Sequence, residues 1–284
     1  FKWSDKEQYH HKVGRGISLS GSDNFEVVNN KIVISRIVKH MSGMFLMNST
    51  DNEFRYNNIT YGTTSKKLSD GFRLRNSDDN RIFNNEITYF YNSLNIYESR
   101  GCYIEDNDIL SKQFGAILFS CLKLKIINNK FSEKGINLRG EKKDHFLSHI
   151  IESNTIRGKP ILYYKNRSDL DIDDNVGELI LTNCSDISIR DRYFDKKPGI
   201  MIHESENISI NNCTFDNELY ETFSGIFADN SKNISVLDCL FNEANIYFIN
   251  VSGSIIDNNV LSEDIEKELD YYESRFSYGV LLFS

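Results

Sequence analysis

The sequence predicts an all-β fold in which the chain winds into a parallel β-helix of about 10–11 coils. Three observations predict this fold. A phrase recurs roughly every 20–28 residues, apolar and polar residues alternate inside each phrase, and only 2 of the 284 residues are proline. Scarce proline suits a continuous sheet, because each proline removes a backbone hydrogen-bond donor.

The recurring phrase begins with a small residue and an apolar run, and it ends about ten residues later with paired asparagines. Gly71–Leu74 leads to Asn84–Ile87, and Gly115–Leu118 leads to Asn128–Phe131. In stacked coils these asparagines lie above one another, where their amides can hydrogen-bond along a ladder. We expect that ladder to be structural and not catalytic. Further copies of the phrase begin at Gly16, Gly43, Leu94, Gly135, Gly199, Gly225 and Asn245.

The elements inside each phrase are predicted to be short strands. Apolar residues alternate with polar ones, as at Phe72 and Leu74 and at Ile208 and Ile210, and a period of 2 indicates strands. Each strand is expected to run for about three to five residues between Asn, Asp, Ser or Gly, which suit tight turns. An array of hairpins is disfavoured because the sequence contains no Asn-Gly dipeptide.

Charge and apolar content limit the possible partners. The net charge of −8 disfavours nucleic acid, which requires a basic face, and no apolar run is long enough to span a membrane. We expect one domain over residues 1–284. Because the chain begins at Phe1 and not at methionine, we also expect it to be a piece of a longer surface protein.

The five cysteines match neither a disulfide framework nor a zinc-binding spacing. Cys213 and Cys239 occupy equivalent positions one coil apart, so we expect them to stack as small apolar fillers. A disulfide between them is the alternative. No metal and no cofactor are expected.

The segment from Gly158 to Ile189 interrupts the rhythm and is more particular than the coils around it. It reads GKPILYYKN over Gly158–Asn166 and VGELILTNCSDISI over Val176–Ile189. Placed between asparagine-rich coils, it resembles the NosD-type β-helix proteins, described as periplasmic copper-binding proteins or as carbohydrate-binding and sugar-hydrolysis (CASH) repeat proteins. The resemblance covers nearly the whole chain, although most of it is the generic coil. It implies a right-handed, single-stranded, pectate-lyase-like β-helix that is extracellular, on the cell surface or in the periplasm.

Residues that alternate with the apolar core positions should form an outward face. Its N-terminal half combines guanidinium groups with aromatic rings, which suits an acidic sugar because carboxylates bind arginine and sugar rings stack on aromatic rings. A salt-bridged face exposed to solvent is the alternative. The residues expected to bind polysaccharide or oligosaccharide are Arg73, Arg75, Tyr97, Phe119 and Arg139.

The C-terminal half of the outward face is apolar, so we expect a protein partner or another part of the chain to cover it. A short amphipathic helix over 262–276 could do so, since Ile265, Leu269, Tyr272 and Phe276 fall at helical spacing. The expected outward columns are Leu162, Ile180, Met201, Phe227 and Tyr247 in one and Tyr164, Thr182, His203 and Asp229 in the next.

An enzyme acting on an acidic glycan is the alternative to a binding protein. A polysaccharide lyase or epimerase requires a base and a cation near the sugar carboxylate, for which Arg75, Tyr97 and Asp70 are candidates. A glycoside hydrolase requires two carboxylates, which Asp70, Asp78 and Asp79 could supply. His203 and Asp229 could form an acid/base dyad.

A third alternative is a structural spacer of a surface layer or adhesion protein. Copper is disfavoured because Met44 and Met47 lie an odd number of residues apart on one strand and so face opposite sides.

Overall fold

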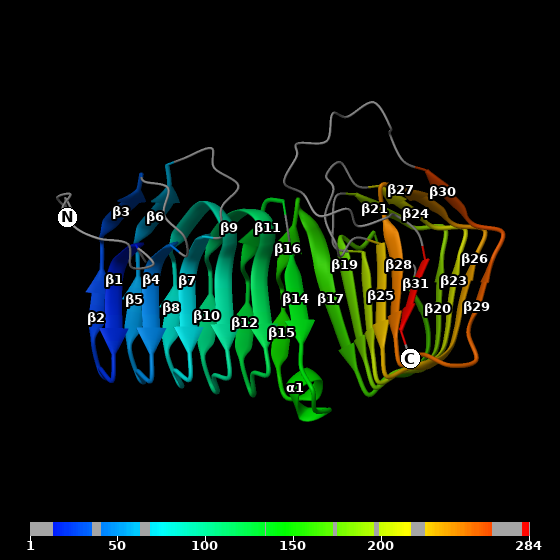
Figure 1. Ribbon diagram of the computed structural model, residues 1–284, viewed down its shortest axis with the longest axis horizontal. Helices are drawn as coiled ribbons and strands as arrows, with labels where there is room; N and C mark the ends of the chain where they lie inside the picture. Colours follow the sequence, from blue (N-terminus) through cyan, green and yellow to red (C-terminus); the bar gives the residue numbers. More distant parts are fainter. Residues whose placement is uncertain are drawn as a thin grey trace. The chain divides into compact units, whose positions relative to one another are not determined.

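The computed structural model describes residues 14–35, 41–62, 69–133, 135–172, 175–195, 199–216, 225–262 and 280–283. It contains two compact units, Phe1–Arg157 (unit 1) and Gly158–Ser284 (unit 2). Each unit is a stack of parallel strands with almost no helix (Figure 1). The prediction of a right-handed parallel β-helix is confirmed, in keeping with the right-handed sense of parallel crossovers.

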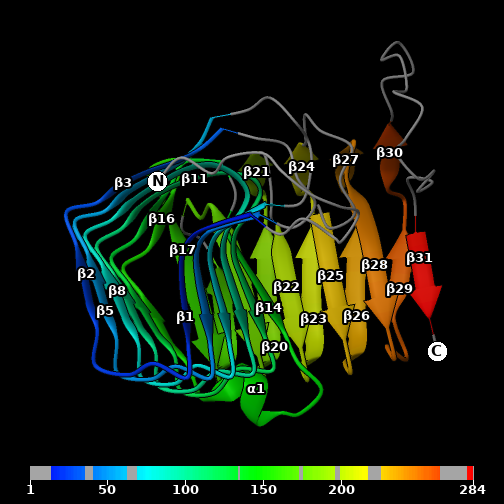
Figure 2. The ribbon, with the colours of Figure 1, turned by 60° about the vertical axis from the view of Figure 1, so that its left-hand side comes forward.

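Two parallel sheets form unit 1, and Figure 2 shows β2, β5 and β8 of the second side by side. A single short helix, α1 (Asp144–Leu147), precedes β15 among the described residues of the unit. The first sheet contains β1 (Gly14–Ser20), β4 (Met41–Met47), β7 (Ser69–Arg75), β9 (Glu86–Tyr97), β11 (Asp108–Phe119), β14 (Ile136–Arg139), β3 (Lys31–Ile34), β6 (Asn58–Tyr61), β13 (Lys130–Phe131) and β16 (Thr155–Ile156); the second contains β2 (Glu26–Val28), β5 (Glu53–Arg55), β8 (Arg81–Phe83), β10 (Tyr103–Glu105), β12 (Lys125–Ile127) and β15 (Ile150–Glu152).

Strands β9 and β11 are longer than predicted, with 12 residues each. Strand β9 joins a segment that pairs with β6 to a segment that pairs with β7. Strand β11 likewise joins a segment that pairs with β13 to one that pairs with β14. No turn separates the two segments of either strand. The prediction of three to five residues is therefore wrong for these strands. An irregularity in their pairing, at Leu110–Ser111 and Ser111–Phe114, marks the place where the strand bends.

Close steric contacts explain why a small residue opens most of the repeated phrases. A Cβ on Gly43 would lie 2.3 Å from Ile59 Cγ2 and 2.8 Å from the carbonyl oxygen of Gly71. A Cβ on Gly71 would lie 2.4 Å from Ile87 Cγ2 and 2.5 Å from the carbonyl oxygen of Ser93. Backbone and core side chains of adjacent coils approach so closely here that only glycine fits.

The predicted asparagine ladder is present in unit 1 and is structural. The Nδ2 atoms of Asn57, Asn85, Asn107 and Asn129 each donate to the Oδ1 atom of the next asparagine, ending at Asn154, over 2.9–3.0 Å. Each acceptor Oδ1 also receives the backbone N–H of the preceding asparagine. All five side chains are buried, so the ladder satisfies polar groups that water cannot reach.

Unit 2 contains three parallel sheets around a core that is partly aromatic. Phe194, Phe215 and Phe241 stack with ring centroids 5.0 and 4.8 Å apart and nearly parallel planes. The first sheet contains β17 (Lys159–Lys165), β19 (Glu178–Thr182), β22 (Ile200–His203), β25 (Gly225–Asp229), β28 (Asn245–Ile249) and β31 (Val280–Phe283); the second, β18 (Ser168–Ile172), β20 (Ser185–Arg190), β23 (Glu206–Asn211), β26 (Lys232–Leu237) and β29 (Ile255–Asp257); the third, β21 (Tyr193–Asp195), β24 (Thr214–Asp216), β27 (Leu240–Asn242) and β30 (Val260–Ser262).

The predicted register of unit 2 is wrong by one residue at β17. Tyr163, and not Leu162, pairs with Ile180, while Lys165, and not Tyr164, pairs with Thr182. Leu162 and Tyr164 instead pack against the hydrophobic core. From β19 onward the predicted columns are correct, because Ile180 pairs with Met201 and Thr182 with His203.

The cysteines are free and buried, as predicted for apolar fillers. The backbone N–H of Cys213 donates to Cys239 Sγ over 3.4 Å, so the pair stacks without a disulfide. Of the helix predicted over 262–276, Ser262 is the last residue of β30, and the remainder lies outside the described residues.

Candidate functional site

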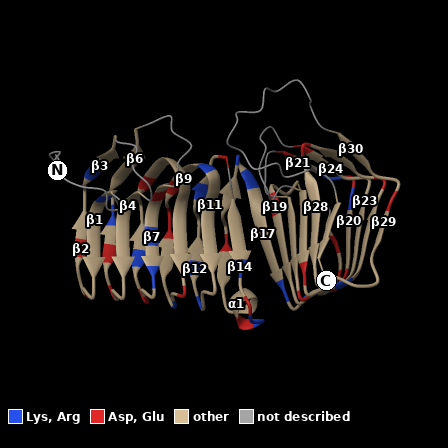
Figure 3. Ribbon diagram, viewed as in Figure 1, with Lys and Arg blue, Asp and Glu red and all other residues tan. Residues whose placement is uncertain are grey.

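The predicted binding residues of unit 1 lie on one face. Arg75, Tyr97, Phe119 and Arg139 pair in register on successive strands from β7 to β14 and so form one column. Arg73 lies in the next column, beside Asn95. We call these five predicted residues the arginine–aromatic face. Figure 3 marks the lysine and arginine positions along the strands of this sheet in blue.

The two rings of the arginine–aromatic face are in contact. The centroids of Tyr97 and Phe119 lie 5.4 Å apart, and both side chains are partly exposed. Arg139 Nε donates to Asn137 Oδ1 over 2.8 Å, which fixes the guanidinium at the end of the column. Arg75 is exposed, and no carboxylate pairs with it among the described residues. The column therefore presents two arginines with an aromatic pair between them.

Asp70 is less exposed than its proposed role as a base requires. Its Oδ1 accepts hydrogen bonds from Asn92 Nδ2 at 3.0 Å and Asn95 Nδ2 at 3.1 Å, and its Oδ2 lies 3.9 Å from Arg73 Nε. The residue is only 6% exposed. The arrangement holds a carboxylate under the face and positions Arg73 above it. Sequence reasoning missed Asn92, although its alignment opposite Asp70 follows from the register.

Asp70 lies too far from Asp78 and Asp79 to form a hydrolytic pair with either of them. Asp70 is the second residue of β7, whereas Asp78 follows its end, and the strand from Asp70 to Arg75 alone spans about 16 Å. Carboxylates that flank a glycosidic bond lie about 5–9.5 Å apart. Asp78 Oδ1 instead accepts the backbone N–H of Arg100 over 2.8 Å, which is a turn contact.

Arg15 extends the arginine–aromatic face, although sequence reasoning did not include it. Its guanidinium carbon lies 3.6 Å from the centroid of the Phe45 ring, and Phe45 pairs in register with Arg73. Loss of hydration and then the charge of Arg73 lower the pKa of Arg15. The positive charge of Arg73 thus acts on the guanidinium of Arg15, and this arrangement favours an anionic ligand.

The predicted His203–Asp229 dyad exists in unit 2 but is not open to solvent. His203 Nδ1 and Asp229 Oδ1 lie 2.7 Å apart on paired strands. The His203 side chain has no exposed surface, and its ring centroid lies 5.8 Å from that of Phe227. Thr182 on the adjacent strand is also fully buried. A substrate cannot reach the imidazole in this conformation.

The apolar column of unit 2 differs from the predicted partner surface. Ile180 and Met201 are buried within this chain, so they are not available to another protein. Phe227 and Tyr247 are partly exposed and stack with centroids 5.7 Å apart.

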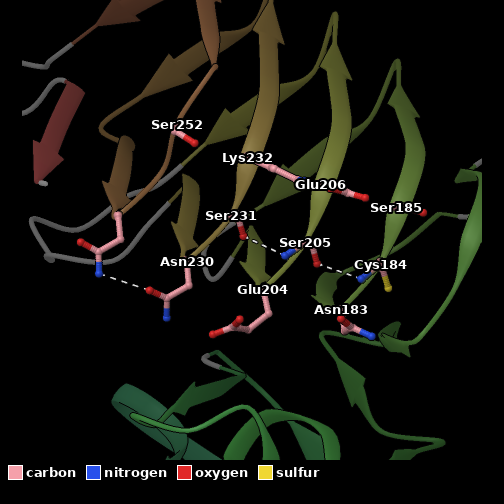
Figure 4. A pocket seen from close by; sticks show the side chains of 11 residues that line it. Asn183, Cys184, Ser185, Glu204, Ser205, Glu206, Asn230, Ser231, Lys232 and Ser252 are labelled. Carbon is pink, nitrogen blue, oxygen red and sulfur yellow. Dashed lines mark hydrogen bonds and ion pairs between the residues drawn. The ribbon is translucent and has the colours of Figure 1, made fainter.

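A polar hollow of about 590 Å³ lies along the turns of unit 2 and was not predicted (Figure 4). Serine hydroxyls along it serve the backbone, since Ser205 Oγ accepts the N–H of Cys184 and Ser231 Oγ accepts the N–H of Ser205, each over 3.0 Å. Lys232 Nζ pairs with Glu206 Oε2 at 2.5 Å. Much of its polar lining is therefore already used in holding the coils together.

A copper centre does not fit the described residues. They contain no group of three or more His, Cys, Asp or Glu side chains that could hold a metal ion. Met44 is fully buried in the core, whereas Met47 pairs with Arg75 in the outward column, so their sulfurs face opposite sides. His149 uses both ring nitrogens, with Nδ1 accepting the N–H of Leu124 and Nε2 lying 2.7 Å from the carbonyl oxygen of His145.

The fold and the column geometry define a parallel β-helix protein with an outward face of arginines and rings. A family model described as "Periplasmic copper-binding protein (NosD)" matches residues 6–162, more than half of the chain. The chain belongs to this NosD family. The family description supports a location outside the cytoplasm. Within the described residues, no helix is long and apolar enough to cross a bilayer.

Solved structures with similar folds have low sequence identity to this chain, and none of the curated proteins matches it. The A-module of mannuronan C-5 epimerase AlgE6 from Azotobacter vinelandii is 10% identical, with a TM-score of 0.34, over 95% of this chain and 80% of that one. The AlgE4 A-module from the same organism is 10% identical, with a TM-score of 0.27, over 95% and 80%. A family 28 exopolygalacturonase from Yersinia enterocolitica is 10% identical, with a TM-score of 0.25, over 85% and 46%.

Proposed function

We propose that unit 1 binds an acidic polysaccharide along the arginine–aromatic face, at the cell surface or in the periplasm. The observation that carries the proposal is the single column of Arg75, Tyr97, Phe119 and Arg139 on consecutive coils. A linear polymer laid along the stack would meet a cation, two rings and a second cation in turn. Coils repeat at about 4.8 Å, so the two arginines lie about 14 Å apart along the axis.

Carboxylate recognition would fall first to Arg75. Its guanidinium is exposed and has no paired carboxylate among the described residues, so a ligand carboxylate need not displace an internal partner. Arg73 Nε lies 3.9 Å from Asp70 Oδ2, which positions its guanidinium, and Arg15 lies over the ring of Phe45. The crowding of positive charge at Arg15 and Arg73 would be relieved by a bound uronate.

The ring pair would supply the apolar part of the site. Tyr97 and Phe119 are partly exposed, and their contact at 5.4 Å makes a platform wider than one ring. The C–H face of a pyranose can stack on such a platform while its carboxylate reaches an arginine. A merely solvated face would not need two adjacent aromatic side chains on neighbouring coils.

Binding of polygalacturonate and alginate oligomers tests the proposal. Arg75→Ala and Tyr97→Ala should each weaken binding at least tenfold in calorimetry, and the affinity should fall as salt is added. Arg190→Ala is the matched control, because Arg190 is an exposed arginine on β20 of unit 2. Unchanged affinity in both unit 1 variants would refute the proposal.

A lyase or epimerase remains a second candidate, favoured by the Asp70 carboxylate beneath Arg73 on the same face. Such an enzyme would abstract a proton from the sugar carbon next to the carboxylate; the partly exposed Tyr97 is the candidate base, while the buried Asp70 would hold Arg73 in place. A lyase would release unsaturated oligomers that absorb in the ultraviolet. If the oligomers stay intact and keep their sugar composition after prolonged incubation, the enzyme alternative is wrong and binding is the function of the face.

A further inference from the structure

A second surface of unit 1 contains a strained aromatic residue. The residue after each strand of the second sheet adopts a left-handed backbone, with φ of 57° at Asn29, 56° at Tyr56, 54° at Asn84, 54° at Asp106 and 54° at Asn128. Asn and Asp tolerate this conformation, whereas a bulky side chain there is a genuine outlier. Tyr56 departs from a column that otherwise carries small polar side chains.

Packing does not explain why tyrosine occupies this position. Tyr56 is 54% exposed, so it fills no part of the core. Its ring meets Phe83 edge-on at a centroid distance of 6.5 Å, and the guanidinium of Arg55 lies 6.0 Å from its centroid. Strained residues that persist without a packing role are found preferentially at functional sites.

Tyr56 begins a strip of rings and cations across β5, β8, β10 and β12. Arg81 lies 5.1 Å from the centroid of Phe83 and 5.9 Å from that of Tyr103. Lys125 lies 5.7 Å from the same Tyr103 ring on the other side. We call Tyr56, Phe83 and Tyr103 with their flanking cations the tyrosine strip. Its outward positions are set by the register of the second sheet, with Arg81, Tyr103 and Lys125 in one column.

Within the described part of the chain, two of the three cations of the tyrosine strip, Arg55 and Arg81, are paired with carboxylates, unlike Arg75 of the arginine–aromatic face. Arg55 pairs with Glu26 at 3.2 Å and with Glu53 at 2.7 Å. Arg81 also pairs with Glu53, at 3.3 Å. An acidic ligand would have to break these pairs, whereas the hydroxyl groups of a neutral ligand can bond to carboxylate and guanidinium alike.

We propose that the tyrosine strip is a separate binding site for a neutral glycan, with Tyr56 as its principal stacking ring. A chain of neutral pyranoses lies along the coils, places the C–H face of a sugar on Tyr56, and bonds its hydroxyls to Glu53, Arg55 and Arg81. This site is on a different sheet from the arginine–aromatic face and does not depend on it.

Tyr56→Asn tests the proposal because it separates binding from stability. It restores the residue type of the column, so relief of strain should raise the midpoint of thermal unfolding by roughly 2–4 °C. It should also weaken binding of at least one of cellohexaose, mannohexaose and xylohexaose at least tenfold, measured by calorimetry. Tyr56→Phe keeps the ring and should bind as the wild type does.

Tyr89→Asn is the matched control, because Tyr89 is also about half exposed and left-handed, with φ of 65°, but lies in β9 of the other sheet. It should gain stability and keep its neutral-glycan binding. Tyr56→Asn should not change alginate binding. A negative result for neutral glycans therefore says nothing against the proposal that the arginine–aromatic face binds an acidic polysaccharide. Three outcomes would overturn the proposal: no hexaose binds the wild type, Tyr56→Asn retains full affinity, or it unfolds at a lower temperature. Loss of alginate binding in Tyr56→Asn would overturn the assignment to a neutral ligand.

Discussion

The buried corner that carries the amide ladder in unit 1 carries thiols in unit 2, where Cys213 and Cys239 follow β23 and β26 by two residues as Asn85 follows β8. Each asparagine of unit 1 both accepts from one coil and donates to the next, as Asn107 does between Asn85 and Asn129. A second corner carries serine in both units: Ser205 Oγ accepts the N–H of Cys184 and donates to the carbonyl oxygen of His203, as Ser77 Oγ does with Ser49 and Arg75. The units therefore differ at the first corner, where unit 1 joins coils by hydrogen bonds between amides, whereas unit 2 has thiols there and adds the stack of Phe194, Phe215 and Phe241 to its core.

The largest effect should come from the ring stack of unit 2. Phe215→Ala removes a fully buried ring that contacts Phe194 and Phe241, and we expect it to lower the free energy of unfolding by about 4 kcal/mol. Urea unfolding measures this loss. Phe215→Leu keeps most of the volume and should cost less than half as much. Equal losses in both variants would show that packing in unit 2 does not depend on the stack.

Asn107→Ala should have the next largest effect, because it breaks the amide ladder of unit 1 on both sides. Asn107 Nδ2 donates to Ile82 O and Asn129 Oδ1, each over 2.9 Å, and its Oδ1 accepts from Asn85. Leaving these buried partners unsatisfied should cost about 3 kcal/mol in urea unfolding. Asp108→Ala, at the exposed neighbouring position on β11, is the control and should change stability little. A loss below about 1 kcal/mol at Asn107 would contradict a structural ladder.

Ser205→Ala in unit 2 should cost less than Asn107→Ala, since it removes two hydrogen bonds and not four. We expect a loss of about 1–2 kcal/mol, measured in the same way. A loss as large as that of Asn107→Ala would mean that hydroxyl corners hold coils as firmly as amide corners.

The effect that is smallest at neutral pH concerns the buried thiols of unit 1, which affect stability only in alkali. Burial raises the pKa values of Cys102 and Cys121 to about 12. A thiol in the unfolded chain ionises near pH 8.5, whereas the buried thiols stay protonated. The free energy of unfolding is therefore undiminished below pH 8.5 and falls as the pH rises toward about 12. The expected loss is about 1 kcal/mol per thiol for each pH unit in this window. Unfolding free energies at pH 8.5 and 10 should differ less in the Cys102→Ala/Cys121→Ala variant, and an unchanged difference would contradict the prediction.

The columns of unit 1 could be predicted because the asparagine phrase marks every coil. Asn85 and Asn107 lie 22 residues apart, so aligning them also aligns Arg75 with Tyr97, which lie the same number of residues apart. At β17 the same counting failed, because Ile161 to Tyr164 are all apolar or aromatic and no alternation shows which of them face the core. Only the pairing with β19 decides it.

The contacts that join side chains of different coils were less predictable. The hydrogen bond from Asn92 to Asp70 depends on the irregular backbone of β9, which alternation alone cannot reveal. The position of Tyr56 in the turn column could be inferred from the sequence, because Tyr56 precedes Asn57 as Asn84 precedes Asn85. Its left-handed backbone could have been inferred from that equivalence, although tyrosine is not a turn-forming residue.

The contact of Gly43 with the backbone of the next coil has a consequence for how such a chain can change length. Because neighbouring coils such as those of Gly43 and Gly71 share the same glycine, the same amide and the same strand register, a duplicated or deleted coil leaves two complementary surfaces in contact. Loss of a single residue instead turns every following side chain of a strand toward the wrong side. Proteins of this kind are therefore expected to grow and shrink by whole coils.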